Sequence, residues 1–104
     1  AYGLLALIAN AEGHPEQALG LAARALALSP REPLRAIWHW GEACAASMLG
    51  REEEALTYAA RGIAANPAFP NCYLGAVVAA RRLGRDAEAT RFVSVLRTTT
   101  FRSV

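Results

Sequence analysis

The apolar residues of this chain recur at spacings of three and four positions, which indicates amphipathic helices. In the segment 33–49, for example, one apolar stripe consists of Leu34, Ile37, Trp38, Ala45, Met48 and Leu49. The pairs and triplets of β-branched residues, "VV" at 77–78 and "TTT" at 98–100, are too short to favour strands. Alanine, the best helix former, occupies 24 of the 104 positions. The pattern therefore predicts an all-α chain.

Glycine and proline mark where these helices begin and end. Gly50 and Gly84 each follow an apolar-periodic segment, where a left-handed residue commonly ends a helix. Pro33 and Pro70 suit the first turn of a helix, where a missing N–H costs nothing. The residue before a proline avoids helical ψ, so helices are expected to stop near Ser29 and at the equivalent Asn66. The predicted helices span residues 2–12, 15–28, 33–49, 51–65, 70–83 and 85–97.

Three segments of the chain repeat one another, namely "GHPEQAL" from Gly13, "GREEEAL" from Gly50 and "GRDAEAT" from Gly84. The period is 37 residues from Ala18 to Ala55 and 34 residues from Ala55 to Ala89. A fixed period in this range is typical of stacked repeat units. Since Pro33 to Gly50 is longer than Pro70 to Gly84, we expect the extra residues to lengthen the helix after Pro33 by about one turn.

This pattern of paired helices, a period near 34 and a closing proline resembles the tetratricopeptide repeat (TPR). The resemblance implies one domain, 1–104, folded as a right-handed superhelix of three units at about 1–30, 31–67 and 68–101. In TPR units, small residues occupy the contact between the two helices. The corresponding positions here are Ala6, Ala18, Ala25, Ala43, Ala55, Gly62, Val77, Ala89 and Leu96. The third unit departs from the pattern at Val77 and Leu96. The second has Glu42 where the family has leucine, which predicts a rotated or lengthened helix there.

A narrower similarity points to the kind of protein that contains this chain. The segments "LSPREP", "LGREEEA", "NPAFPNCYLGAVVAARRLGRDAEA" and "LRTTTF" are similar to TPR tails behind bacterial class III adenylate cyclase domains and behind winged-helix transcriptional regulators. The chain begins with alanine rather than methionine, so we expect it to be part of a longer, cytoplasmic signalling protein. The resemblance implies binding of a protein or peptide partner, and carries no catalytic residue into this segment.

TPR proteins bind partners on the concave face, which the first helix of each unit lines. Carrying over these helix positions implies a binding face made of Leu7, Asn10, Trp40, Cys44, Ser47, Asn71, Leu74, Val78 and Arg81. Trp38 and Trp40 are two residues apart and so point about 200° apart on a helix. One of them should therefore pack between helices while the other faces the groove. The alternative for Trp40 is packing against the next unit.

Composition and charge argue against several other classes of function. The net charge is +2, all eleven basic residues are arginine, and only Arg81, Arg82 and Arg85 cluster, which disfavours nucleic-acid binding by this segment. The longest early apolar run, "LLALIA", is too short to cross a bilayer. His14 and His39 share no ligand spacing with Cys or Asp, so no metal or other cofactor is expected. The run Glu52–Glu54 suits the positive end of a helix dipole better than catalysis, and no enzyme activity is expected.

The two cysteines are expected to be free thiols. When the repeat units are aligned, Cys44 lies about six positions further along its helix than Cys72 does along its own, which is an axial offset of ~9 Å. A disulfide requires Cα atoms within about 7 Å.

The C-terminal end of the predicted stack lacks a polar capping helix. Phe92, Val93, Val95 and Leu96 precede "TTTFRSV", and Phe101 stands where the first two units have proline. Repeat arrays need a polar outer face at their ends. We therefore expect this apolar surface to be covered by Phe101 and Val104 folding back, by a segment outside this sequence or by a second copy. Self-association that dimerises an attached cyclase or DNA-binding domain is the alternative to partner binding.

Overall fold

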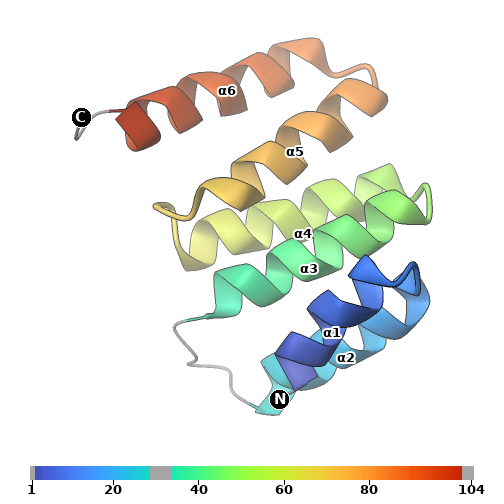
Figure 1. Ribbon diagram of the computed structural model, residues 1–104. Helices are drawn as coiled ribbons and strands as arrows, with labels where there is room; N and C mark the ends of the chain where they lie inside the picture. Colours follow the sequence, from blue (N-terminus) through green and yellow to red (C-terminus); the bar gives the residue numbers. More distant parts are fainter. Residues whose placement is uncertain (1, 29–33, 102–104) are drawn as a thin grey trace.

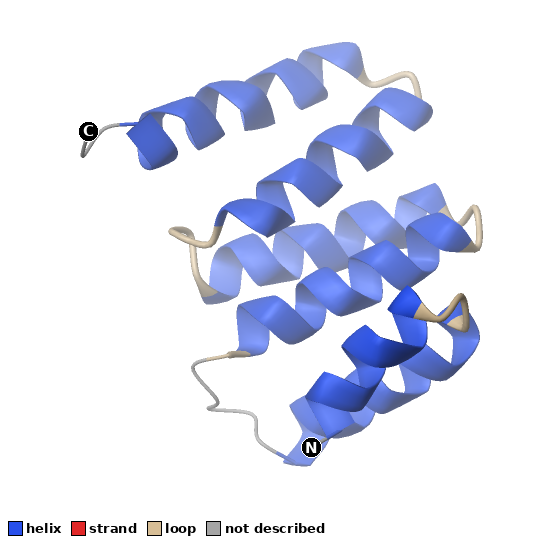
Figure 2. Ribbon diagram, in the orientation of Figure 1, coloured by secondary structure: helices blue, strands red, loops and turns tan. Residues whose placement is uncertain are grey.

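The structure is a computed structural model, which describes residues 2–28 and 34–101. These residues form six α-helices and no strand (Figure 2). The all-α prediction is therefore confirmed for the described part of the chain. The helices are α1 (Tyr2–Ala11), α2 (Pro15–Leu28), α3 (Arg35–Met48), α4 (Glu52–Ala65), α5 (Pro70–Arg82) and α6 (Asp86–Phe101).

The predicted helix bounds agree with the observed ones to within two residues, except at the end of α6. That helix continues through the three threonines to Phe101, and the Thr98 hydroxyl donates to the Ser94 carbonyl oxygen at 3.0 Å. Threonine is a weak helix former, but such a bond one turn back accommodates its hydroxyl within a helix. The sequence prediction ended this helix at residue 97, which is four residues too early.

The prediction that the helix after Pro33 is one turn longer than its counterpart is wrong. Helix α3 has 14 residues and α5 has 13. Most of the extra length instead precedes α3, because residues 29–34 connect α2 to α3 whereas residues 66–69 connect α4 to α5. Leu34 is the residue before the first helical residue of α3, and its ψ of 9° lies outside the helical range, so the helix begins after it. The expected first-turn role of Pro33 and the stop at Ser29 lie outside the described residues.

A left-handed glycine closes the first helix of each hairpin. The Gly50 N–H donates to the Ser47 carbonyl at 3.0 Å, and the Arg51 N–H donates to the Ala46 carbonyl at 2.8 Å. This pair of bonds satisfies carbonyl groups that the helix end would leave unpaired. The same two bonds recur in the other two hairpins. The glycines with φ between 76° and 81° are Gly13, Gly50 and Gly84.

The three hairpins stack along the molecule, from α1 and α2 at one end to α5 and α6 at the other (Figure 1). Each new hairpin places its first helix against both helices of the preceding one, so that α3 contacts α1 and α2, and α5 contacts α3 and α4. The first helices also contact one another in order, whereas α2 and α4, and likewise α4 and α6, have no contact among the described residues. The layer of first helices, α1, α3 and α5, is thus closed, since each helix contacts the next. The layer of second helices, α2, α4 and α6, is open, since α4 contacts neither α2 nor α6.

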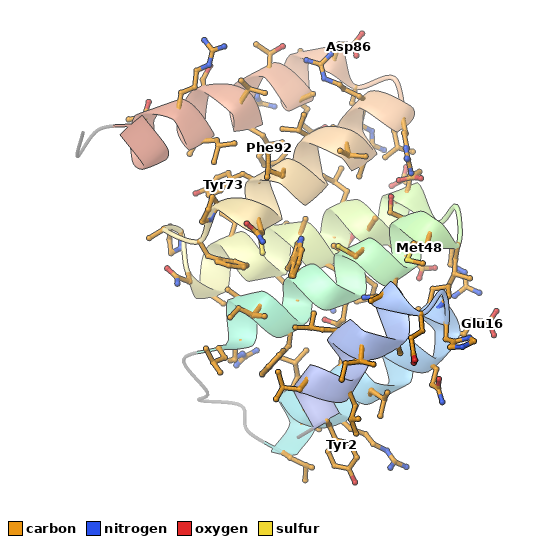
Figure 3. All side chains as sticks on the ribbon, in the orientation of Figure 1. Tyr2, Glu16, Met48, Tyr73, Asp86 and Phe92 are labelled. Carbon is orange, nitrogen blue, oxygen red and sulfur yellow. The ribbon has the colours of Figure 1, made fainter. Side chains whose placement is uncertain are left out.

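The core between the helices is built mostly of alanine. One cluster, shared by α3, α4 and α5, consists of Ala43, Ala46, Ala55, Leu56, Ala59, Ala76 and Ala79. Phe92 of α6 packs against this cluster and points toward α5 (Figure 3). Small side chains let helix axes approach closely, but each contact then tolerates little added volume. At the opposite extreme of exposure, Glu16 and Asp86 point into solvent from the first turns of their helices (Figure 3).

The alanine contacts predict that a larger residue at Ala55 destabilises the fold. Ala55 is 1% exposed and lies at the centre of the alanine cluster. Ala55→Leu should lower the free energy of unfolding by about 1–3 kcal/mol, because the added methylenes force neighbouring helices apart. Urea denaturation followed by circular dichroism measures this change. Ala60→Leu, on the exposed side of the same helix, is the matched control and should be nearly neutral. Equal stability of both variants would contradict the packing described.

Candidate functional site

The residues predicted for the concave face all lie on α1, α3 and α5, and none of them is buried. They occupy repeated positions, mostly three, six or ten residues before the glycine that ends each helix. Because these three helices contact one another in order, the repeated positions form one continuous face, here called the inner face. Its half-buried members are Leu7, Asn10, Trp40, Cys44, Ser47 and Asn71, and its exposed members are Leu74, Val78 and Arg81.

The two tryptophans have different environments. Trp38 is 9% exposed, and its ring covers Gly3 of α1 so closely that a Cβ on Gly3 would overlap with it. Trp40 is half-buried and meets Phe69 edge to face, with ring centroids 6.3 Å apart and planes at 81°. Phe69 immediately precedes α5. Trp40 therefore packs partly against the next hairpin, as the alternative interpretation expected, while the rest of its surface stays accessible on the inner face.

Two polar residues of the inner face are already engaged within the protein. The Asn10 Nδ2 donates to the Gly41 carbonyl at 3.0 Å, which ties α1 to α3. The Ser47 hydroxyl donates to Glu52 at 3.3 Å and accepts from Arg82 at 2.9 Å. Arg82 also forms an ion pair with Glu52 at 3.0 Å. These groups connect neighbouring hairpins, which leaves Asn71 and the exposed Arg81 as the polar groups better placed to meet a partner.

A buried polar pair, which the sequence analysis did not find, lies in the middle of α3. His39 Nδ1 and Glu42 Oε1 are 2.8 Å apart, and the two residues are 5% and 6% exposed. Their spacing of three residues places them on one side of the helix. The His39 ring within hydrogen-bond distance offsets the cost of burying Glu42 at a position where leucine was expected. The sequence hinted at this pair through the three-residue spacing and through the glutamate at a position where leucine was expected. Only the structure shows that both side chains are buried, which is what makes their hydrogen bond matter for stability.

The two cysteines are free thiols that differ in burial. Cys72 is buried, donates to the Ala36 carbonyl at 3.3 Å, and lies so close to Gly62 that a Cβ there would overlap with its sulfur. Burial, and to a lesser degree the neighbouring charge of Cys44, raises the pKa of Cys72 from 9.0 to about 11. Burial also raises the pKa of the half-exposed Cys44 thiol. Both thiols are therefore protonated at neutral pH and poor nucleophiles, since the thiolate is the reactive form.

Thiol modification should reveal this difference between the two cysteines. With iodoacetamide at pH 8, we expect Cys44 to react slowly and Cys72 to react only after unfolding. Above pH 9 the unfolded chain loses the Cys72 proton while the folded chain retains it, so stability should fall as the pH rises from 9 to about 11. Mass spectrometry of the alkylated sites measures the first effect and urea titration at each pH the second. Cys72→Ser should remove most of the slope and leave the part that Cys44 contributes, whereas an unchanged slope would contradict the assignment.

Metal sites, membrane spans and surface hollows are the other features of the described residues that bear on function. No group of three or more metal-ligating side chains occurs among the described residues. No helix within 2–28 or 34–101 is both long and apolar enough to span a membrane. A surface hollow of about 420 Å³ lies on the open layer. Its rim carries the Glu53–Arg85 ion pair at 2.6 Å, and none of the inner-face residues lines it.

Comparison with known proteins gives no relative from which a function could be transferred. No protein-family model matches the chain, and no curated protein matches it. The function therefore has to be argued from the inner face and its surroundings.

Proposed function

We propose that this chain is a TPR-like protein–protein interaction module, whose inner face binds an extended peptide segment of a partner protein. The observation that carries the proposal is a set of nine residues, eight of them at repeated positions, on three contacting helices; none of the nine is buried. The first helices contact one another and the second helices do not, which supports a stack that curves toward α1, α3 and α5. A long groove along such a curve is the geometry that repeat proteins use for binding.

The chemistry of the inner face favours a peptide with an apolar and an acidic group. Leu74 and Val78 are 52% and 43% exposed, and the accessible part of Trp40 lies on the adjoining helix at the position equivalent to Leu74. Burying these side chains supplies binding free energy, and tryptophan is prominent among binding hot spots. Arg81 can hold a carboxylate through two parallel hydrogen bonds. Asn71 offers both a donor and an acceptor to a peptide backbone.

The proposal extends to the protein that contains this module. The segments that resemble TPR tails support a place beside a cyclase or DNA-binding domain of a bacterial regulatory protein. No catalytic step and no cofactor is assigned to the module itself. Self-association is the second candidate function, and the exposed apolar side chains of Leu4, Leu5 and Ile8 on α1 favour it.

A peptide-display selection tests the binding proposal. Peptides with a leucine or phenylalanine near an acidic residue should be enriched on the wild-type chain. Trp40→Ala should weaken binding of a selected peptide by about 2 kcal/mol, or roughly 30-fold, while the helical circular-dichroism signal persists. If Trp40→Ala unfolds the chain, the tryptophan is a core residue and the groove loses its anchor.

A matched pair of valines distinguishes the inner face from the rest of the surface. Val78 on α5 and Val95 on α6 are 43% and 45% exposed. Val78→Glu should abolish binding of the selected peptide, because it places a charge beside the apolar anchors. Val95→Glu should leave binding unchanged. Equal effects of the two substitutions, or none from either, would contradict the inner face as the binding site.

A further inference from the structure

The last helix offers no apolar surface of the extent that the sequence predicts. Three of the four apolar residues expected to leave it bare are half-buried, namely Phe92, Val93 and Leu96, and the fourth, Val95, is exposed. The expected covering by Phe101 and Val104 concerns side chains outside the described ones. The inner face, where repeated positions lie side by side, says more about a partner.

The apolar residues of the inner face form a track across α1, α3 and α5. Counted back from the glycine that ends each helix, Leu7, Cys44 and Val78 occupy the sixth position. Trp40 and Leu74 occupy the tenth position, one helical turn earlier, and so lie on the same side of their helices. A free cysteine behaves as a small apolar residue. Because the first helices contact one another in order, these five residues, here called the apolar track, continue from one helix to the next.

Polar groups flank the apolar track on both sides. The third position before the glycine carries Asn10, Ser47 and Arg81, and the thirteenth position carries Asn71 in α5. Asn10 and Ser47 are hydrogen-bonded within the protein. Arg81 is exposed and Asn71 is half-buried, and neither side chain forms a hydrogen bond or ion pair within the described part of the chain. These two groups are therefore available to a bound segment.

The accessible charge beside the apolar track is positive and lies at one end. Within the bounds of α1, α3 and α5 the only carboxylate belongs to Glu42, which is 6% exposed beside His39. Helix α1 carries no charged residue, whereas α5 carries the unpaired Arg81. A guanidinium group binds a carboxylate through parallel hydrogen bonds. The charge thus favours a segment whose acidic residue lies on α5.

The distance between neighbouring helices sets the spacing of side chains in a segment that lies along the track. Packed helices lie about 8–10 Å apart. A polyproline II segment rises about 3.1 Å per residue with three residues per turn, so residues three apart are about 9.3 Å apart and point to the same side. In a β-strand, residues three apart span a similar length but point to opposite sides. Polyproline II is thus the extended conformation that brings one side chain to each helix.

A bound helix fits the inner face less well than a polyproline II segment. Residues seven apart on a helix match the distance between the helices, at about 10.5 Å. The backbone of a helix is bonded internally, so a helix would cover Asn71 without offering its side chain a partner, which costs free energy. Polyproline II has no internal hydrogen bonds and leaves its carbonyl groups to Asn71. The edge-to-face pair of Trp40 and Phe69 also provides the aromatic surface on which proline-rich segments dock.

We propose that the partner segment lies on the apolar track as a polyproline II helix, with an apolar side chain at every third residue and an acidic residue beside the one that lies on α5. This inference rests on the proposed function and adds the class of the partner, a proline-rich acidic segment. Each apolar side chain then meets the track on one helix, while Asn71 binds the segment's backbone and Arg81 its carboxylate.

Fluorescence polarisation with labelled peptides of equal length and composition tests the spacing. Each peptide contains three leucines, a glutamate beside the first or the last leucine, and proline at the other positions. The peptide with leucines three apart should bind about 10-fold more tightly than those with leucines two or four apart, because each of the latter loses an anchor. Equal affinity for all three spacings overturns the inference but leaves peptide binding intact. Tighter binding of a helix-forming peptide with leucines seven apart does the same. If none of these peptides and no display-selected peptide binds, the proposed function fails as well.

Charge reversal at Arg81 tests the place of the acidic residue. Arg81→Glu should weaken binding of the peptide with leucines three apart about 10-fold, and exchanging the peptide's glutamate for arginine should restore it. Arg91→Glu is the matched control, because Arg91 is equally an exposed arginine but lies on α6. Circular dichroism verifies that both variants are folded. Equal losses from the two variants, or no rescue by the arginine peptide, overturn the contact with Arg81.

Discussion

Replacing Trp38 by alanine is expected to lower the free energy of unfolding by about 3–5 kcal/mol, a large part of the stability of a domain of this size. The indole is 9% exposed and fills the space between α3 and α1 above Gly3, so its removal leaves a cavity. Trp40→Ala should cost less, since Trp40 is only half-buried. Urea denaturation monitored by circular dichroism compares the two variants. A larger loss for Trp40→Ala would show that the assignment of the tryptophans is reversed.

The contact between Trp38 and Gly3 gives this prediction a sharper form. In the wild type, a Cβ on Gly3 would overlap with the indole ring, so Gly3→Ala should destabilise the chain by about 1–3 kcal/mol. In the Trp38→Ala background the obstacle is gone. The same substitution should then stabilise the chain by up to about 1 kcal/mol, because alanine is a better helix former than glycine. An effect of Gly3→Ala that has the same sign in both backgrounds would contradict the close contact.

The buried pair on α3 is expected to give the second large effect. Removing one partner of a buried, hydrogen-bonded pair leaves the other desolvated and unpaired. His39→Leu leaves a buried carboxyl group at 6% exposure and should cost about 3–5 kcal/mol. Glu42→Leu leaves a buried imidazole ring without its hydrogen-bond partner and should cost about 1–3 kcal/mol. The double variant should be more stable than His39→Leu alone.

A double-mutant cycle of these variants isolates the interaction between His39 and Glu42. Unfolding free energies of the wild type, the two single variants and the double variant are measured by urea denaturation. His14→Leu is the control, because His14 is exposed in a turn and should change stability little. If the effects of the two single changes simply add, the 2.8 Å contact contributes nothing to stability.

Most of the helices could be predicted from the sequence because their signals are local. Gly13, Gly50 and Gly84 end helices through bonds to residues three to five positions earlier in the chain, so a glycine after an apolar-periodic run is a sufficient sign. The end of α6 was missed for a local reason too, since Thr98 forms a bond within its own helix. The length of α3 was misjudged because a repeat period gives the number of extra residues and not their place.

The sequence predicted which residues share the inner face, but not which contacts their side chains make. The resemblance to TPR units implied the inner-face residues on three helices, where the structure leaves all of them accessible at least in part. The sequence could not show that Asn10 donates a hydrogen bond to the Gly41 carbonyl, or that Ser47 hydrogen-bonds both Glu52 and Arg82. Glu52 is five residues from Ser47 in the same hairpin, but Gly41 is 31 residues from Asn10 and Arg82 is 35 residues from Ser47. Only the packing of neighbouring hairpins brings these last two pairs together.

The sequence by itself determined that the chain is helical, where its hairpins turn, and which positions repeat, because glycine, proline and alanine act on the backbone near them. Only the tertiary structure decided which tryptophan is buried, since that depends on Gly3 of another helix. It also decided that Glu42 lies inside beside His39. Finally, it showed that the exposed large apolar side chains of α1 are Leu4, Leu5 and Ile8, whereas among the described side chains of α6 only Val95 is exposed. Exposure depends on which neighbours cover a face and not on how apolar that face is.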